Sequence, residues 1–132
     1  MALKISLKPN ERMIIGGAVI QNGGKSTDLY VENKVPILRE KDILSEQDAT
    51  TPCRNLYLVI QLMYIDEVNL AKYHHTYWEL VSAIVDAAPS MTGGVDKISE
   101  CIVGGRYYQA LRLTRELIKY EEELMKNACK PD

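Results

Sequence analysis

The sequence has no phenylalanine, only three cysteines, and no apolar run of the roughly 20 residues that a membrane-spanning helix needs. Its longest apolar run, residues 56–65, has the length of a buried helical segment. The N-terminal residues MALKISLK lack the apolar core of a secretory signal, so we expect a cytoplasmic protein. The cysteines are odd in number and widely spaced, which argues against a disulfide framework or a paired-cysteine metal knuckle. We therefore expect reduced thiols at Cys53, Cys101 and Cys129.

Charge is distributed unevenly along a chain whose composition is that of a folded protein. The 132 residues are 46% hydrophobic and 26% charged, and the net charge of −2 argues against a general polyanion binder. Residues 1–41 nevertheless carry seven Lys/Arg against four Asp/Glu, whereas residues 42–132 carry nine against fourteen. This asymmetry indicates two surfaces with different partners.

The first 44 residues have the pattern of β-strands. Residues 3–7 alternate apolar and polar side chains, and further short apolar runs follow at 12–15, 18–21, 29–31 and 35–39. Asn22-Gly23 predicts a hairpin turn between the third and fourth strands. Pro36 cannot donate to a strand ladder, so it belongs at the start of the last strand or on a sheet edge. Residues 38–42, LREKD, are predicted as the charged strand that ends this part of the chain.

The rest of the chain has helical periodicity, after a polar connector at 44–51. Thr51-Pro52 is typical of a helix start, and that helix should run to about residue 65. Asn69 is the expected cap of a second helix that ends at Pro89, and shorter and longer helices are expected at 95–103 and 106–126. The predicted fold class is α+β, with an antiparallel β module at 1–44 and an α-helical bundle of about four helices at 45–132.

The sequence contains no segment that matches an enzyme motif. The segment GGKST at 23–27 lacks the earlier glycine of a phosphate-binding loop and lies between strands, so it predicts a turn. His74 and His75 are adjacent, which on a helix points them roughly 100° apart, and exposed histidines are expected rather than a metal pair. The run Glu121-Glu122-Glu123 is most simply a solvated helix face. We expect no catalytic residue, no metal and no cofactor.

The helical part is rich in tyrosine, which combines an apolar ring with a polar tip and suits both core rims and interfaces. Core packing with the hydroxyl at the rim is one interpretation, and a partner surface is the other. The candidate partner-binding residues all lie on the last expected helix: Tyr107, Tyr108, Arg112 and Arg115.

Four segments together resemble FlbT, the bacterial flagellin messenger regulator: LKISLKPNERMIIGGAVIQNG, LREKDIL, TTPCRNLYLVIQLMY and RYYQALRLTRELIKYE. The resemblance covers nearly the whole chain. It implies a protein that binds the 5′ untranslated leader of flagellin mRNA, represses its translation and promotes its decay. It also implies a second small regulator, FlaF, as a companion, with an effect on flagellin that is positive in some members.

The N-terminal module alone also resembles the carbon storage regulator CsrA, through Asn10-Glu11, the hairpins and the closing residues Val35 to Glu40. That resemblance implies a homodimer formed by strand exchange and RNA contacts from the first and last strands. Arg39 matches the family's arginine on the last strand, whereas Ser6 and Leu7 replace the basic residues expected on the first.

Together these resemblances make flagellin mRNA the expected ligand, with FlaF and flagellin as possible protein partners and no membrane association. An arginine offers a planar fork to a phosphate, a guanine edge or an unpaired base. The alternative for Arg39 is a cross-strand ion pair with neighbouring acids, and the alternative for the whole protein is a protein-binding adaptor or flagellar export chaperone partner. The candidate RNA-binding residues are Arg39, Lys41, Lys4, Lys8, Arg12 and Lys34.

Overall fold

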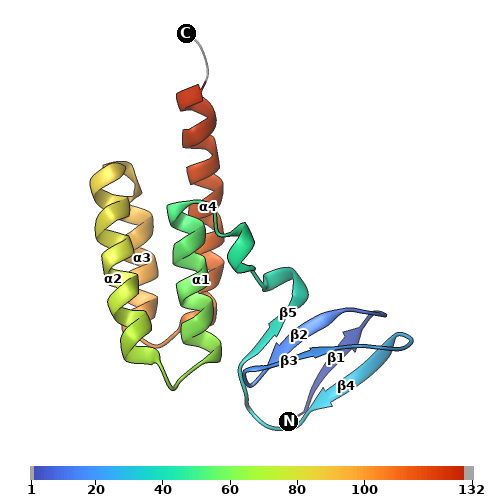
Figure 1. Ribbon diagram of the computed structural model, residues 1–132. Helices are drawn as coiled ribbons and strands as arrows, with labels where there is room; N and C mark the ends of the chain where they lie inside the picture. Colours follow the sequence, from blue (N-terminus) through green and yellow to red (C-terminus); the bar gives the residue numbers. More distant parts are fainter. Residues whose placement is uncertain (1, 130–132) are drawn as a thin grey trace. The chain divides into compact units, whose positions relative to one another are not determined.

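The computed structural model describes the backbone of residues 2–129 and the side chains of residues 2–127, so the side chain of Cys129 lies outside the described residues. The protein is α+β, with N-terminal antiparallel strands followed by four main helices, as the sequence predicts (Figure 1). The chain divides into two compact units between Ile43 and Leu44. We call residues 2–43 the β unit and residues 44–129 the helical unit.

The β unit contains five strands in two antiparallel sheets (Figure 1). One sheet pairs β1 with β4, and the other has the order β3-β2-β5. Alternate side chains of the strands form a shared core around Ile5, Leu7 and Met13. Their bounds are β1 Leu3–Leu7, β2 Arg12–Ile15, β3 Ala18–Gln21, β4 Thr27–Val31 and β5 Ile37–Arg39.

The tight hairpin of this unit joins β2 to β3, at Gly16-Gly17. Both glycines have positive φ, 56° and 87°, as a two-residue type I′ turn requires. The hairpin predicted at Asn22-Gly23 is wrong, because β3 and β4 belong to different sheets and are not paired. Asn22 instead ties that connection down: its Nδ2 donates to the carbonyls of Leu7, Lys8 and Lys25 at 3.2, 3.1 and 2.9 Å.

The segment LREKD is only partly a strand. β5 ends at Arg39, and Glu40–Asp42 form the short 3-10 helix η1, closed by a hydrogen bond from Ile43 N to the Glu40 carbonyl at 3.1 Å. Pro36 stands directly before β5, which is an edge strand, and this confirms the predicted position of the proline. Arg39 is therefore the last strand residue of the β unit, at the point where the sheet ends.

The helical unit begins with the connector, which includes the 3-10 helix η2 Glu46–Asp48. Thr51 caps α1 as predicted, since its Oγ1 accepts from Arg54 N at 3.2 Å and Pro52 follows at the first helical position. In this unit α1 packs against both α2 and α4, and α3 packs against α4. The remaining bounds are α1 Pro52–Ile65, α2 Leu70–Ala87, η3 Pro89–Met91, α3 Thr92–Val103 and α4 Tyr107–Cys129.

Two helical details differ from the sequence expectations. α3 begins at Thr92 and not near residue 95. Its Gly94 lies at a close contact with α4, where an added Cβ would lie 2.9 Å from Leu117 Cδ1. The interpretation of residues 121–123 as a solvated face is wrong for Glu121, which is only 5% exposed. α4 buries Glu121 beside the start of α1, where backbone N–H groups need an acceptor.

Candidate nucleic-acid interface

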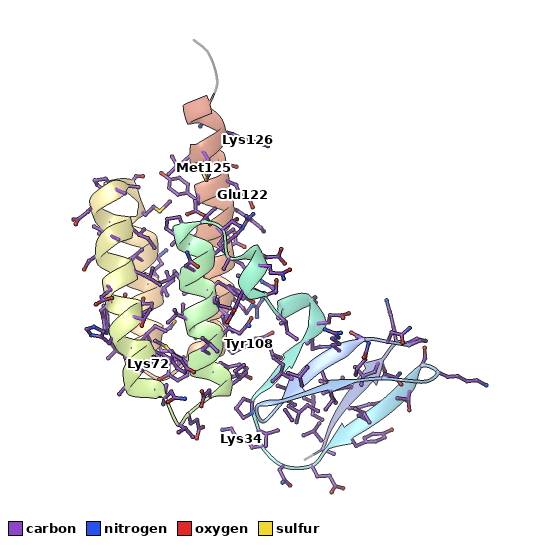
Figure 2. The ribbon with its side chains drawn as sticks, viewed as in Figure 1. Lys34, Lys72, Tyr108, Glu122, Met125 and Lys126 are labelled. Carbon is purple, nitrogen blue, oxygen red and sulfur yellow. The ribbon has the colours of Figure 1, made fainter. Side chains whose placement is uncertain are left out.

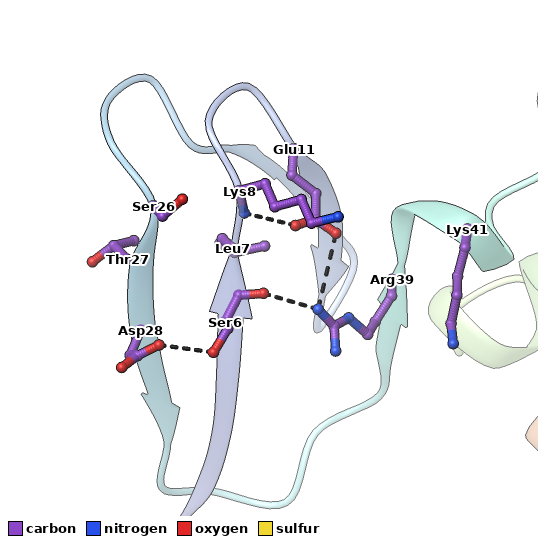
Figure 3. Close-up of a pocket in the computed structure, with 9 residues that line it drawn as sticks. All are labelled: Ser6, Leu7, Lys8, Glu11, Ser26, Thr27, Asp28, Arg39 and Lys41. Atoms are coloured by element: carbon purple, nitrogen blue, oxygen red, sulfur yellow. Dashed lines mark hydrogen bonds and ion pairs between the residues drawn. The ribbon is translucent and has the colours of Figure 1, made fainter.

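A hollow of about 850 Å³ opens on the β unit beside β1 (Figure 3). Its walls come from β1, β4, β5 and the turn between β1 and β2, so residues far apart in sequence meet there. Most of the lining is polar or charged, which suits a polar or ionic ligand better than an apolar one. The lining residues are Ser6, Leu7, Lys8, Glu11, Ser26, Thr27, Asp28, Arg39 and Lys41.

Arg39 connects two sides of this hollow. Its Nη2 donates to the carbonyl oxygen of Ser6 on β1 at 2.9 Å and lies 3.9 Å from Glu11 Oε2 (Figure 3). The side chain keeps 42% exposure. A guanidinium has five N–H donors in a fixed fork, and among residues 2–129 the structure gives Arg39 no other hydrogen bond. Arg39 is thus held by one nitrogen while most of its donors stay available.

Glu11 is the acid that faces Arg39, from the turn between β1 and β2. Its Oε1 accepts from Lys8 N at 2.8 Å, and Asn10 beside it has a φ of 65° that the turn requires. The expected cross-strand ion pair of Arg39 is therefore made, but with Glu11 rather than with a neighbour such as Glu40 or Glu32. The pair is long, at 3.9 Å, and the Arg39 side chain is 42% exposed, so it contributes little stability, typically about 1 kcal/mol or less.

A second polar row lies on the outer face of the β1–β4 pair. Ser6 stands opposite Asp28 and donates from Oγ to Asp28 Oδ1 at 2.8 Å, while Lys4 Nζ lies 3.6 Å from Asp28 Oδ2. Lys4 in turn stands opposite Tyr30. The row thus consists of the Lys4 ammonium, the Asp28 carboxylate and the Ser6 hydroxyl, and the last two also line the hollow.

The structure brings together some of the predicted RNA-binding residues and not others. Arg39, Lys8 and Lys41 line the hollow, and Lys4 lies on the adjoining face of β1. Arg12 and Lys34 are exposed but do not line it. The sequence analysis did not assign the acids Glu11 and Asp28 to the site, although Glu11 belongs to the Asn10-Glu11 segment of the CsrA resemblance.

Of the four candidate partner-binding residues on α4, two make contacts inside the helical unit and two remain exposed. Tyr107 is half-buried, its hydroxyl 3.2 Å from His74 Nε2, and burial raises the pKa of its phenol. Arg115 Nη2 contacts the Tyr57 hydroxyl at 3.5 Å and its guanidinium lies over that ring. These two residues thus hold helices of the unit together, and the prediction of an exposed His74 is wrong.

Tyr108 and Arg112 remain on the surface of α4, and Tyr108 is labelled in Figure 2. Tyr108 is 42% exposed, and its ring centroid lies 5.9 Å from that of Tyr64 on α1. His75 is also exposed, as predicted, and its Nε2 lies 2.8 Å from Glu79 Oε1. Tyr108, with the half-buried Tyr64 beside it, offers an aromatic surface of a kind that suits contact with another protein.

Buried polar groups of the helical unit serve the fold. Glu121 Oε2 accepts from Cys53 N at 3.0 Å, which supplies an acceptor to the start of α1 from a different helix. Burial, with the Glu121 carboxylate beside it, raises the pKa of the Cys53 thiol to about 12. Cys53 is therefore a packed thiol and not a nucleophile.

Two further observations concern the described residues only. Within residues 2–129 there is no group of three His, Cys, Asp or Glu side chains placed to hold a metal ion. None of the described helices combines the length and apolar character that crossing a membrane requires.

Comparison with known proteins places the chain in a family. The sequence profile described as "Flagellar protein FlbT" matches residues 3–125. The chain belongs to the FlbT family. No solved structure matches it.

Relatives in this FlbT family match along nearly their whole length. "Probable flagellum biosynthesis repressor protein FlbT 1" of Bradyrhizobium diazoefficiens is 46% identical over 125 residues, covering 94% of this chain and 85% of the relative. "Probable flagellum biosynthesis repressor protein FlbT" of Rhodopseudomonas palustris is 40% identical, covering 95% and 98%. "Flagellum biosynthesis repressor protein FlbT" of Caulobacter vibrioides is 38% identical, covering 93% and 89%.

Proposed function

We propose that this chain is a cytoplasmic, non-enzymatic repressor of flagellum biosynthesis that acts on flagellin mRNA. The β unit binds the 5′ untranslated leader, lowers translation and promotes decay of the message. The names of the FlbT relatives support the repressor role. The hollow beside Arg39 supports RNA as the ligand, and it is the single observation on which the RNA-binding step rests.

The chemistry of the hollow fits a strand of RNA better than a duplex. Arg39 is fixed by the Ser6 carbonyl yet keeps donors for a phosphate or a guanine edge. Lys8 and Lys41 add positive charge at the same opening. Glu11 and Asp28 offset part of that charge, so binding by charge alone is weak and base contacts must contribute. Unpaired bases in leaders and loops offer such contacts.

The β unit also supports a proposal about assembly. Its resemblance to CsrA suggests a homodimer in which β1 and β5 of different copies meet. In this chain Arg39 already contacts β1 of its own copy, at Ser6. A dimer of this protein therefore needs no strand exchange to bring Arg39 against a first strand. Light scattering on the purified protein distinguishes monomer from dimer.

Filter binding with the flagellin leader of the encoding bacterium tests the RNA-binding step. Wild type should bind the leader at least tenfold more tightly than a scrambled RNA of equal length at two salt concentrations. Arg39→Ala should lower affinity by about tenfold, as expected for loss of one well-placed guanidinium contact. If the lost contact is to phosphate, the slope of log affinity against log salt should fall by about 1.

Arg12→Ala is the matched control, because Arg12 belongs to the same unit, carries the same charge and lies outside the hollow. It should change leader affinity by no more than about threefold, the share expected of long-range charge. Equal losses in Arg39→Ala and Arg12→Ala would mean that the hollow has no special role. Equal binding of leader and scrambled RNA by wild type would overturn the proposed function.

A second candidate function is supported by the exposed Tyr108 beside Tyr64: a protein-binding adaptor, or an export chaperone partner, that holds FlaF or flagellin without touching RNA. Co-purification after nuclease treatment tests it. Tyr108→Ser should abolish capture of FlaF or flagellin, whereas Tyr120→Ser, which changes a tyrosine of similar exposure on the same helix, should not. Capture that survives Tyr108→Ser would contradict this surface.

A further inference from the structure

Tyr30 presents an aromatic ring to solvent from the middle of the β unit. It is 62% exposed although it lies within β4, between Leu29 and Val31, which turn toward the core. Strand alternation explains the direction, since Tyr30 occupies the outer face that the core leaves open. A single exposed apolar side chain is ordinary, so exposure alone assigns Tyr30 no role. Whether Tyr30 belongs to a binding surface depends on its neighbours on the outer face.

The register of β1 and β4 places Tyr30 in line with the hollow. Tyr30 stands opposite Lys4, and the next outward pair is Ser6 with Asp28, both of which line the hollow. Ser6 is also the residue whose carbonyl holds Arg39. Tyr30 is therefore one step along the sheet from the hollow, on the face that continues its wall.

We propose that the Tyr30 ring is a stacking platform for an unpaired base of the same RNA strand that Arg39 contacts. This inference rests on the proposed function and names the part of the RNA that the adjoining face recognises. Bases of any kind stack on an aromatic ring, because each has a π-face. A flanking cation such as Lys4 is well placed for the phosphate next to the stacked base.

Spacing favours a single strand. Two residues along a β-strand span about 6.6 Å, roughly twice the ~3.4 Å rise per nucleotide of a DNA duplex strand, and the rise in an A-form RNA duplex is smaller still. Neighbouring nucleotides can therefore reach both Tyr30 and the Ser6–Asp28 pair only if their bases are unstacked. A duplex, with its bases stacked and paired, cannot place a base on the ring.

Asp28, which lies between Tyr30 and Arg39, also favours contact with bases over contact with phosphates. The Asp28 carboxylate accepts from the Ser6 hydroxyl at 2.8 Å and lies 3.6 Å from Lys4 Nζ. These two contacts hold the negative charge of Asp28 on the outer face of the β1–β4 pair. A carboxylate repels phosphate but accepts from exocyclic amino groups of bases. Between Tyr30 and Arg39 the strand should therefore turn its bases, and not its backbone, toward the protein.

The test uses full-length protein and single-stranded 12-nucleotide RNAs tiled across the flagellin leader, with 2-aminopurine substituted at successive positions. Stacking on an aromatic ring quenches this fluorescent base. Tyr30→Ala should weaken binding of the best fragment by about tenfold, the effect expected of one lost base stack. It should also abolish quenching at one position under saturating protein. Tyr30→Phe keeps the ring and should retain both within about twofold.

Val19→Ala is the control for loss of exposed apolar area, since Val19 is 68% exposed on β3 in the other sheet, and it should bind and quench like wild type. Unchanged binding and quenching in Tyr30→Ala, with Arg39→Ala still impaired, would overturn the stacking site alone. Failure of wild type to prefer the leader would overturn the proposed function and this inference with it. Equal loss in Tyr30→Phe and Tyr30→Ala would assign the effect to the hydroxyl and reject stacking.

Discussion

The buried polar side chains of the helical unit differ in their contacts from the charged side chains around the hollow of the β unit. In the helical unit, buried polar groups bind the backbone of a neighbouring segment: Glu121 Oε2 accepts from Cys53 N at 3.0 Å, and Gln61 bonds the connector at 2.8 and 3.0 Å. In the β unit, charged groups of the hollow meet in partly exposed contacts such as Arg39 with Glu11 at 3.9 Å. The first kind of contact stabilises a fold, whereas the second can be exchanged for a ligand.

These two kinds of contact differ in what their loss costs the protein. A buried hydrogen bond that is lost leaves an unpaired group and costs stability, so its residues cannot also serve a ligand. An exposed ion pair contributes little and can open at small cost. The abundance of tyrosine and acid in the helical unit is therefore less informative than the few charges around the hollow.

The largest expected effect concerns Glu121. Glu121→Ala removes the acceptor of the Cys53 N–H and should lower the free energy of unfolding by about 2 kcal/mol, the usual cost of a buried unpaired group. Glu123→Ala, an exposed acid on the same helix, should change it by less than about 0.5 kcal/mol. Urea denaturation followed by circular dichroism measures both. Similar losses of unfolding free energy in the two variants would contradict the structural role assigned to the buried Glu121.

A smaller effect is expected at the hollow. Glu11→Gln keeps an acceptor for Lys8 N but removes the charge that faces Arg39, so leader affinity should rise about two- to fivefold, in line with the modest strength of an exposed ion pair. Glu32→Gln makes the same charge change outside the hollow and should have a weaker effect. Filter binding at low salt measures both. A fall in affinity for Glu11→Gln would show that Glu11 orients Arg39 for the ligand.

The smallest effect is a pH dependence in the helical unit. Hydrogen bonds from Tyr73, at 2.7 Å, and Asn69 lower the pKa of Asp66 below its ordinary 3.8. This lowered pKa contributes stability above pH 3.8 that is lost as the pH falls through the folded-state value. Thermal melts below pH 5 should therefore show a shallower acid decline in Tyr73→Phe than in wild type. The control is Tyr120→Phe, which removes a hydroxyl that bonds Ser90 Oγ and not Asp66, and its acid decline should follow wild type. A wild-type acid decline in Tyr73→Phe would contradict the assignment of this pH dependence to Asp66.

The sequence predicts the elements of this fold well because their signals are local. Strand alternation at residues 3–7 and the Thr51-Pro52 helix start depend on neighbours only, and both are confirmed. The hairpin expected at Asn22-Gly23 fails because strand pairing depends on distant partners. Burial of Glu121 likewise depends on another helix, which a run of three acids does not reveal.

The candidate site is predictable only in part, for the same reason. Arg39 is found from the family resemblance and lies in the hollow. Its partners, the Ser6 carbonyl and Glu11, have no motif, since a backbone oxygen is not a residue type and the acid comes from a separate turn. Arg12 carries the same charge as Arg39, yet the fold leaves it outside the hollow.

The central claim is that the β unit, and not the helical unit, contacts the RNA. Photo-crosslinking tests it most directly, with flagellin leader carrying 4-thiouridine and the cross-linked peptides mapped by mass spectrometry. We expect adducts within residues 3–41, concentrated on β1, β4 and β5, that a scrambled RNA does not give. Adducts confined to residues 70–127, or equal yields with the scrambled RNA, would contradict it.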